Sequence, residues 1–326
     1  MLSLLRNTLS KSIIGLAIGA ASALAHAAPD YPTRPVRLIV SYAPGGASDV
    51  IARSVASKLS ERWKQSVVVE NKPGGNTVIS ALDLINSRPD GYSLMLALDT
   101  TLVMNQHLFR TPRYDPLKDI TPIAGVIEFP LFLMTRTDTG SATAQDYIAR
   151  AKEEKGELRT GVSAVLNIIA SEIFNAGAGV KTTPLQYKGT ADLTMALLRG
   201  DIDYIMDVET TAAPHVQAGK LKILATSGAK RVPTYPDVPT FEEAGLKDSE
   251  LTAWFGIIGP AGMDPELVAK LNKDFIWAIQ EPEVKSLLQE KSLFAAPSSA
   301  EALKERIVVD SQKYGEIIRR HNLQID

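Results

Sequence analysis

The stretch VRLIVSYAPGGASDV, residues 36–50, joins a mostly apolar run to a helical pattern through a glycine corner. Val36–Val40 is apolar enough to predict a buried strand. In Asp49–Lys64, apolar residues recur at the spacing of a helix packed on one face. Gly45 and Gly46 separate the two patterns and allow a sharp change of direction. The stretch therefore predicts a strand–loop–helix unit, the basic element of an α/β fold.

The glycine corner also has the features of an anion-binding loop. Gly45 and Gly46 lack a Cβ, so their amides can approach a ligand closely. The free N–H groups and positive dipole end of the following helix would point at the same place. The alternative is a tight turn with no ligand, capped by Ser48 or Asp49. A carboxylate or another small anion would fit the first interpretation without lysine or metal.

The same alternation of strand and helix continues after the corner. Val67–Glu70 and Ser93–Leu98 are predicted strands, and 77–87 is a predicted helix between them. This order predicts a parallel sheet with right-handed crossovers. The middle of the chain repeats the alternation, with elements expected at 144–153, 159–162, 167–176, 183–187, 191–199, 204–207, 211–218 and 221–226. Helices are expected again at 265–280, 283–291 and 300–321.

Two lobes are the expected organisation of this α/β chain. Apolar runs broken by prolines at 120–135 suggest a strand that passes between lobes, and the chain returns near residue 255. We predict a first lobe from residues 28–126 and 257–326, and a second lobe from residues 127–256. The two crossings would form a hinge.

The first 27 residues predict a secretory signal peptide. Residues 1–11 carry two basic side chains and no acidic one, and residues 12–24 are a short apolar stretch. Ala25-His26-Ala27 is a small-x-small cleavage pattern. The alternative, an uncleaved membrane anchor, would need about 20 apolar residues. We expect export to the periplasm of a Gram-negative bacterium.

Composition argues against several classes of function. The chain has 35 Lys and Arg, 37 Asp and Glu, and no cysteine. It therefore has no basic field for nucleic acid and no thiol chemistry. No histidine or carboxylate pattern has metal-ligand spacing. Gly161-Val162-Ser163-Ala164-Val165 begins a hydrolase elbow but lacks its second glycine, and Asp201 with Asp203 suggests a turn rather than a catalytic pair. We expect no catalytic residue, no metal and no cofactor.

Two further corners follow predicted strands. Leu98-Asp99-Thr100-Thr101 ends a strand of the first lobe, and Tyr187-Lys188-Gly189-Thr190 joins a strand to a helix in the second. Ligands of open α/β sheets gather at the carboxyl ends of strands, so the corners predict a clamshell binding protein. The alternative is a half-buried Tyr187 with its hydroxyl at the rim and a solvated Lys188.

The chain resembles the Bug-type, or tripartite tricarboxylate transporter, periplasmic solute-binding proteins along nearly all of the predicted mature length. The motifs are YPTRPVRLIV (31–40), APGGASD (43–49), VVENKPG (68–74), PDGY (89–92), YDPLKD (114–119), YKG (187–189), HVQAGKL (215–221), YPDVPT (235–240), WFG (254–256) and PAG (260–262). The resemblance implies a type II periplasmic-binding-protein fold that holds a small carboxylic acid between its lobes. It also implies a monomer that hands its ligand to a membrane permease of one large and one small subunit. A same-fold sensor that signals to a membrane kinase is the alternative.

The expected ligand site combines loops of both lobes. In such proteins a ligand carboxylate is held largely by backbone amides and ordered water at loops after early strands. The expected contacts of the first lobe are Tyr42, Ala43, Gly45, Gly46, Ala47, Ser48, Asp49, Thr100 and Thr101. Those of the second are Ser163, Val165, Asn167, Tyr187, Lys188, Gly189 and Asp207.

Two segments depart from the pattern of the family. The turn Gly74-Gly75-Asn76 is shorter than usual. Residues 161–169 are largely apolar where the family has a polar loop. We hypothesise that Val162, Val165 and Leu166 form an apolar wall, which would favour an aromatic or alkyl carboxylate over citrate-like ligands. The alternative is that these side chains pack into their own lobe.

Overall fold

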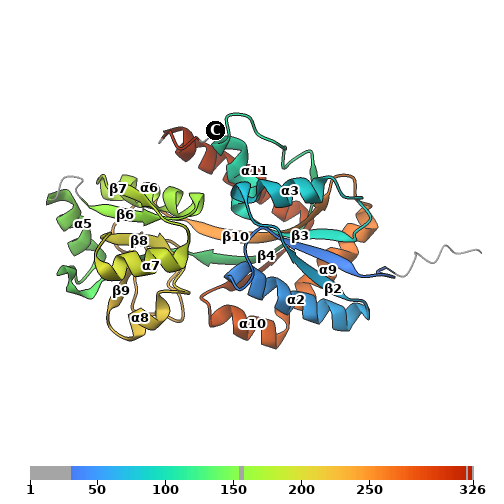
Figure 1. The fold of residues 1–326 in the computed structure, drawn as a ribbon, viewed down its shortest axis with the longest axis horizontal. Helices are drawn as coiled ribbons and strands as arrows, with labels where there is room; N and C mark the ends of the chain where they lie inside the picture. Colours follow the sequence, from blue (N-terminus) through green and yellow to red (C-terminus); the bar gives the residue numbers. More distant parts are fainter. Residues whose placement is uncertain (1–30, 154–157, 321, 325–326) are drawn as a thin grey trace, which may run out of the picture. The chain divides into compact units, whose positions relative to one another are not determined.

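The computed structural model describes residues 31–153, 158–320 and 322–324. The predicted signal peptide, residues 1–27, lies outside the described residues. By its contacts the chain divides into two units, Met1–Arg34 and Pro35–Asp326. The fold described below is that of the second unit, which contains two β-sheets (Figure 1).

The first sheet contains the predicted parallel unit. It has six strands in the order β11-β4-β10-β3-β1-β2. β1 (Val36–Val40) pairs in parallel with β2 (Val67–Asn71) and with β3 (Ser93–Leu98). α2 (Ala47–Trp63) and α3 (Val78–Ile85) follow β1 and β2. The strand–helix alternation expected from residue 36 to residue 98 is thus confirmed.

Three antiparallel strands complete this sheet. β10 (Thr252–Pro260) lies between β3 and β4 (Ile120–Pro130) and runs antiparallel to both. β11 (Phe294–Ser298) pairs with β4 at the edge. The sequence analysis missed β11, because the sequence FAAPS has one large apolar residue and a proline. Proline is tolerated in a strand only where no partner needs its missing N–H, as at an edge.

The second sheet has five strands in the order β7-β6-β8-β5-β9. β6 (Arg159–Val162) runs parallel to β7 (Thr183–Gln186) and β8 (Tyr204–Asp207). β5 (Phe132–Arg136) runs antiparallel to β8 and β9 (Leu221–Thr226). The alternation predicted for the middle of the chain therefore builds a separate sheet.

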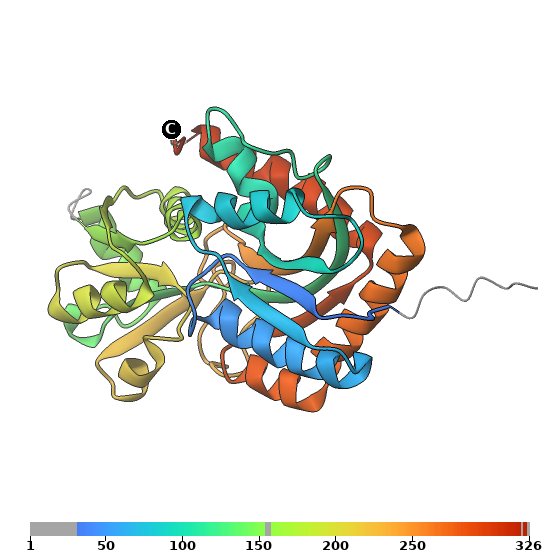
Figure 2. The ribbon, with the colours of Figure 1, turned by 45° about the vertical axis from the view of Figure 1, so that its right-hand side comes forward.

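Helices cover both faces of the two sheets (Figures 1 and 2). On the six-stranded sheet, α2 packs with α9 (Pro265–Gln280) and α10 (Pro282–Gln289) on one face, and α11 (Ala300–Arg320) packs against β4 on the other. Around the five-stranded sheet, one core centres on Phe132, Leu193 and Ile205. The remaining helical elements are η1 (Gly75–Thr77), η2 (Thr100–Met104), α4 (Asn105–Leu108), η3 (Thr137–Thr139), α5 (Ala144–Glu153), α6 (Val165–Ala178), α7 (Thr190–Arg199) and α8 (Ala213–Gln217).

The chain passes between the sheets at two places. Leu131 separates β4 from β5, and the segment 227–251 leads from β9 to β10. The expected lobe boundaries, 126/127 and 256/257, fall inside β4 and β10, both of which belong to the six-stranded sheet. The division into a first lobe of residues 28–126 and 257–326 and a second lobe of residues 127–256 stays a prediction, whereas the connections between the two sheets lie at residue 131 and at 227–251.

Candidate ligand-binding site

The corner after β1 leaves the start of α2 open. Gly46 is the N-cap of α2, and no side chain caps the helix. Gly45 and Gly46 are exposed, and Ala47 is half-buried. The first helical hydrogen bond runs from the Val50 amide to the Gly46 carbonyl at 3.1 Å. The amides of Ala47, Ser48 and Asp49 have no carbonyl acceptor within the helix, so they are available to an anion.

Neither Ser48 nor Asp49 is the N-cap, so that expectation is wrong. Asp49 is the third residue of α2, and its carboxylate accepts a hydrogen bond from the Gly45 amide at 3.0 Å. It also pairs with the Arg53 guanidinium at 2.9 Å. The hydrogen bond from Arg53, with the one from Gly45, outweighs burial and lowers the pKa of Asp49 to about 2. Asp49 therefore holds the loop as an anion that Arg53 neutralises.

A second layer of contacts supports the backbone of this corner. Arg53 donates from Nη2 to Asn71 Oδ1 at 3.2 Å, and Asn71 donates from Nδ2 to the Tyr42 carbonyl at 2.9 Å. The sequence analysis did not select Arg53 or Asn71. The i, i+4 spacing of Asp49 and Arg53 was the available signal, because residues four apart share a helix face.

Thr100 and Thr101 are buried, in contrast to the exposed glycines. They begin η2, a π-type turn directly after β3. The Thr101 hydroxyl donates to Thr77 Oγ1 at 2.8 Å, and the Thr101 carbonyl accepts from the Tyr114 hydroxyl at 2.6 Å. Only 1% of the surface of Thr101 is exposed, and its hydroxyl and carbonyl anchor the turn to Thr77 and Tyr114.

Asp99 is a buried acid that the site prediction omitted. It is fully buried, and neither carboxylate oxygen has a hydrogen-bond partner in the described part of the chain. Burial raises its pKa to about 7 against the lowering effect of the nearby Thr100 amide, and the charge of Asp310 raises it further while Arg306 lowers it. Burial and then Asp99 raise the pKa of the Tyr42 phenol. An acid directly after the apolar run LMLAL was a usable signal, because strand ends face ligands.

The loop after β6 is organised by Asn167. Its Oδ1 accepts from the Ala164 amide at 3.1 Å and from the Ser163 hydroxyl at 3.1 Å. Its Nδ2 donates to the Met206 carbonyl at 2.9 Å. Asn167 is itself buried. We assign it to positioning the half-buried Ser163 at the start of α6.

The proposed apolar wall is smaller than expected. Val162 and Leu166 are buried, as the alternative interpretation predicted. Val165 is half-buried and Ala164 is exposed. Of the three side chains, only Val165 offers appreciable surface to a ligand.

The corner after β7 resembles the corner after β1. Gly189 is the N-cap of α7, no side chain caps that helix, and the space beside its Cα is open. Tyr187 is half-buried against the core of the second sheet, and Lys188 is exposed. Asp207, at the end of the adjacent β8, is buried.

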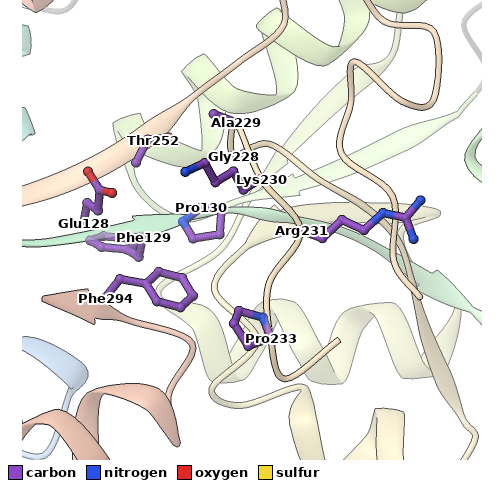
Figure 3. A pocket seen from close by; sticks show the side chains of 10 residues that line it. All are labelled: Glu128, Phe129, Pro130, Gly228, Ala229, Lys230, Arg231, Pro233, Thr252 and Phe294. Carbon is purple, nitrogen blue, oxygen red and sulfur yellow. The ribbon is translucent and has the colours of Figure 1, made fainter. Parts of the chain in front are cut away.

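A separate pocket of about 310 Å³ lies beside the crossing strands (Figure 3). None of the predicted site residues lines it, and the Phe294 ring and Pro130 stand at its wall. Its lining residues are Glu128, Phe129, Pro130, Gly228, Ala229, Lys230, Arg231, Pro233, Thr252 and Phe294. In the described ranges, no group of three or more His, Cys, Asp or Glu side chains is arranged to hold a metal ion. No helix among them is long and apolar enough to span a bilayer.

The sequence matches the family model of the tripartite tricarboxylate transporter family receptor over residues 51–323. The chain belongs to this family. Its members are periplasmic solute-binding receptors and not enzymes, so the resemblance stated from the motifs is confirmed.

Individual relatives agree in sequence and fold. Protein BugT of Bordetella pertussis is 28% identical over 312 residues, covering 94% of this chain and 96% of BugT. The structure of Rpa4515 from R. palustris with adipate superposes with a TM-score of 0.80 at 29% identity, covering 89% of this chain and 97% of that one. MatC from Rhodopseudomonas palustris with bound malate gives a TM-score of 0.78 at 26% identity, covering 88% and 100%. The predicted periplasmic-binding-protein fold is confirmed.

Proposed function

We propose that this receptor captures a small carboxylic acid between its lobes and delivers it to a tripartite tricarboxylate-type permease of one large and one small subunit. The family supports the receptor role, and the adipate and malate in the two related structures support a carboxylate ligand. Residues 1–27 would direct export to the Gram-negative periplasm, where the receptor acts as a monomer.

The observation that carries this proposal is the uncapped start of α2. The exposed Gly45 and Gly46 leave room for a ligand, and the amides of Ala47, Ser48 and Asp49 in the first turn lack carbonyl acceptors within the helix. A carboxylate there would receive charge-assisted hydrogen bonds and the favourable end of the helix dipole. Asp49 is already neutralised by Arg53, so it competes less with the ligand charge.

In this mechanism the first lobe binds the carboxylate and closure adds the second lobe. Hinge closure around a ligand is a common device of two-lobed binding proteins. The permease would select the closed form, because closure distinguishes a loaded receptor from an empty one. Val165, half-buried at the start of α6, supports a ligand with an alkyl or aromatic part.

The test deletes one amide without changing a side-chain contact. Ala47 is the first residue of α2, a position that tolerates proline. Ala47→Pro removes the N–H at that position, and we expect roughly a tenfold or greater loss of affinity for a carboxylate measured by calorimetry. Ala300→Pro at the start of α11 is the matched control and should bind as the wild type does.

The ligand panel for these titrations is adipate, hexanoate, benzoate, malate and citrate. Binding of none of these acids, or equal affinity of Ala47→Pro and wild type, would remove the carboxylate from the β1–α2 corner. Binding of malate or citrate without any of the alkyl or aromatic acids would reject the contribution of Val165.

A further inference from the structure

Asp207 lies where β8 ends beside the first turns of two helices. Its Oδ1 accepts a hydrogen bond from the Val208 amide at 2.8 Å. Two polar side chains lie close enough to lower the pKa of its carboxyl group. They are Asn167, in the first turn of α6, and Thr190, the first residue of α7. Asp207 is only 5% exposed.

The second carboxyl oxygen of Asp207 has no hydrogen-bond partner in the part of the chain that the structure describes. Oδ2 is buried and makes no hydrogen bond within the described residues. Burial of an unpaired carboxylate oxygen is costly, and proteins normally provide a partner. Two nearby ionisable groups do not supply one. Lys188, in the loop between β7 and α7, is exposed, and the buried Glu209 interacts with Ser292 and Lys291.

The groups that act on the Asp207 carboxyl are the Val208 amide and the side chains of Asn167 and Thr190, all of them uncharged. On the adjacent strand β5, the residue opposite Asp207 is Phe132, which is also uncharged. No cation in this set stabilises an ionised carboxylate. Burial is the largest effect and raises the pKa of Asp207 to about 6, against the hydrogen bonds that lower it.

The start of α7 beside Asp207 supplies donors to the same place. Gly189 leaves the helix uncapped, and the space next to its Cα is open. This part of the second sheet therefore combines free amide donors with one unpartnered carboxyl oxygen. A ligand carboxylate would suit both, provided that a proton lies between it and Asp207.

Building on the proposed carboxylate receptor, we propose that protonated Asp207 donates a hydrogen bond from Oδ2 to the distal carboxylate of a dicarboxylate ligand, so that binding takes up one proton. The proton comes from solvent and stays on Oδ2, and both ligand carboxylates remain ionised. The proximal carboxylate occupies the amides of the β1–α2 corner. The alkyl chain between the two carboxylates contacts Val165.

The probe is adipate, titrated by calorimetry from pH 6 to pH 8, where its carboxylates are largely ionised. Because only the protonated form of Asp207 binds well, the apparent Kd should rise about 50-fold between pH 6 and pH 8. Titrations at pH 8 in phosphate and in Tris, which differ in ionisation enthalpy, should report uptake of close to one proton. Hexanoate, which has no distal carboxylate, should bind with little dependence on pH.

Three variants identify the titrating group. Asp207→Asn keeps a donor on that side chain but cannot titrate, so adipate affinity should become nearly independent of pH and exceed that of the wild type at pH 8. Asp201→Asn, which removes an exposed acid paired with Arg199, should keep the wild-type slope. Glu209→Gln should also keep it, which separates Asp207 from a second buried acid two residues further along the chain.

The outcomes distinguish this inference from the function on which it rests. A pH slope that survives in Asp207→Asn, or adipate binding without proton uptake, would overturn the role of Asp207 and leave the carboxylate receptor standing. Hexanoate binding without adipate binding would do the same. If no carboxylate of the panel binds at any pH, both proposals fail.

Discussion

Ser227 and Leu251 exchange two hydrogen bonds at the point where the chain leaves the second sheet. Ser227 donates from Oγ to the Leu251 carbonyl at 2.6 Å, and the Leu251 amide donates to the Ser227 carbonyl at 2.8 Å. The same hydroxyl accepts from the Leu131 amide at 2.9 Å, and the Ser227 amide donates to the Leu131 carbonyl at 2.8 Å. One fully buried serine thus joins both places at which the chain crosses between the sheets.

Removal of the Ser227 hydroxyl should weaken the fold. Ser227→Ala leaves the Leu131 amide and the Leu251 carbonyl each without a buried partner, so we expect a loss of about 1–3 kcal/mol in the free energy of unfolding. Urea denaturation measures it. Ser57→Ala, on the exposed face of α2, should change stability by less than about 0.5 kcal/mol. Equal stability of the two variants would mean that the hydroxyl does not tie the crossings.

The positive φ angle of Gly45 leads to a second prediction, on the cost of adding a side chain there. Its φ is +84°, and a Cβ placed there would meet no atom within 4 Å. The cost of a side chain is therefore conformational and not steric crowding by neighbours. Gly45→Val should lower the free energy of unfolding by roughly 1–2 kcal/mol, and Gly45→Asn by less, because asparagine tolerates the left-handed region. Thermal unfolding should rank the wild type, Asn and Val in that order; an equally stable Val variant would contradict this.

Asp49 should stabilise the protein in a pH-dependent way. Its pKa is lowered to about 2 in the folded state, below the value of about 3.9 in an unfolded chain. The contribution is therefore complete above pH 4 and is lost as the pH falls toward 2. Asp49→Asn should cost about 1–2 kcal/mol at pH 7 and much less near pH 2. Asp237→Asn, at an exposed position, should show no such dependence, and a constant difference for Asp49→Asn would reject the assignment.

Asp274 holds α9 to α2. Its carboxylate accepts from Trp63 Nε1 at 2.8 Å, Arg62 Nε at 2.8 Å and Lys270 Nζ at 2.7 Å. Burial alone would raise the pKa of Asp274, but these hydrogen bonds outweigh it, and the net shift is downward. Stability from Asp274 is thus present above about pH 4 and is lost as the pH falls through its lowered pKa.

Asp274→Asn should lower the free energy of unfolding at pH 7 by about 2–3 kcal/mol, because two cations lose their shared anion. Guanidinium chloride would screen these charges, so urea denaturation at pH 7 and pH 3 is the measurement. Asp138→Asn removes an exposed partner of Arg136 and should cost at most about 0.5 kcal/mol. A loss at pH 7 no larger than that of the control would show that the buried contacts do not contribute.

Periodicity predicted the elements that bury a continuous face. The bounds expected for β1, β3, β6, β8 and β9 match the structure. β1, β3, β8 and β9 are mostly apolar runs next to turn residues, whereas β6 has the sequence RTGV. β11 was missed because it is stabilised by pairing with β4. The π-type turn after β3 was missed as well, because its hydrogen bonds involve the distant Thr77 and Tyr114.

The candidate site, like the fold, was predicted correctly in some features and wrongly in others. The local pattern of Gly45 and Gly46 predicted an open corner, and the structure leaves that corner exposed and uncapped. The assignment of Asp49 as N-cap was wrong, because its carboxylate reaches Arg53 and the Gly45 amide from the first turn of the helix. Which of the other expected contacts touch a ligand stays a prediction.

The sequence by itself determined the α/β class, the family and the glycine corner, because these depend on short-range patterns of apolar residues, turns and motifs. Only the tertiary structure decided that Asp99 and Asp207 are buried with oxygens that accept no hydrogen bond from the described residues, and that Ser227 joins Leu131 to Leu251. Burial and hydrogen bonding of such groups depend on residues far away in the chain, which local sequence does not encode.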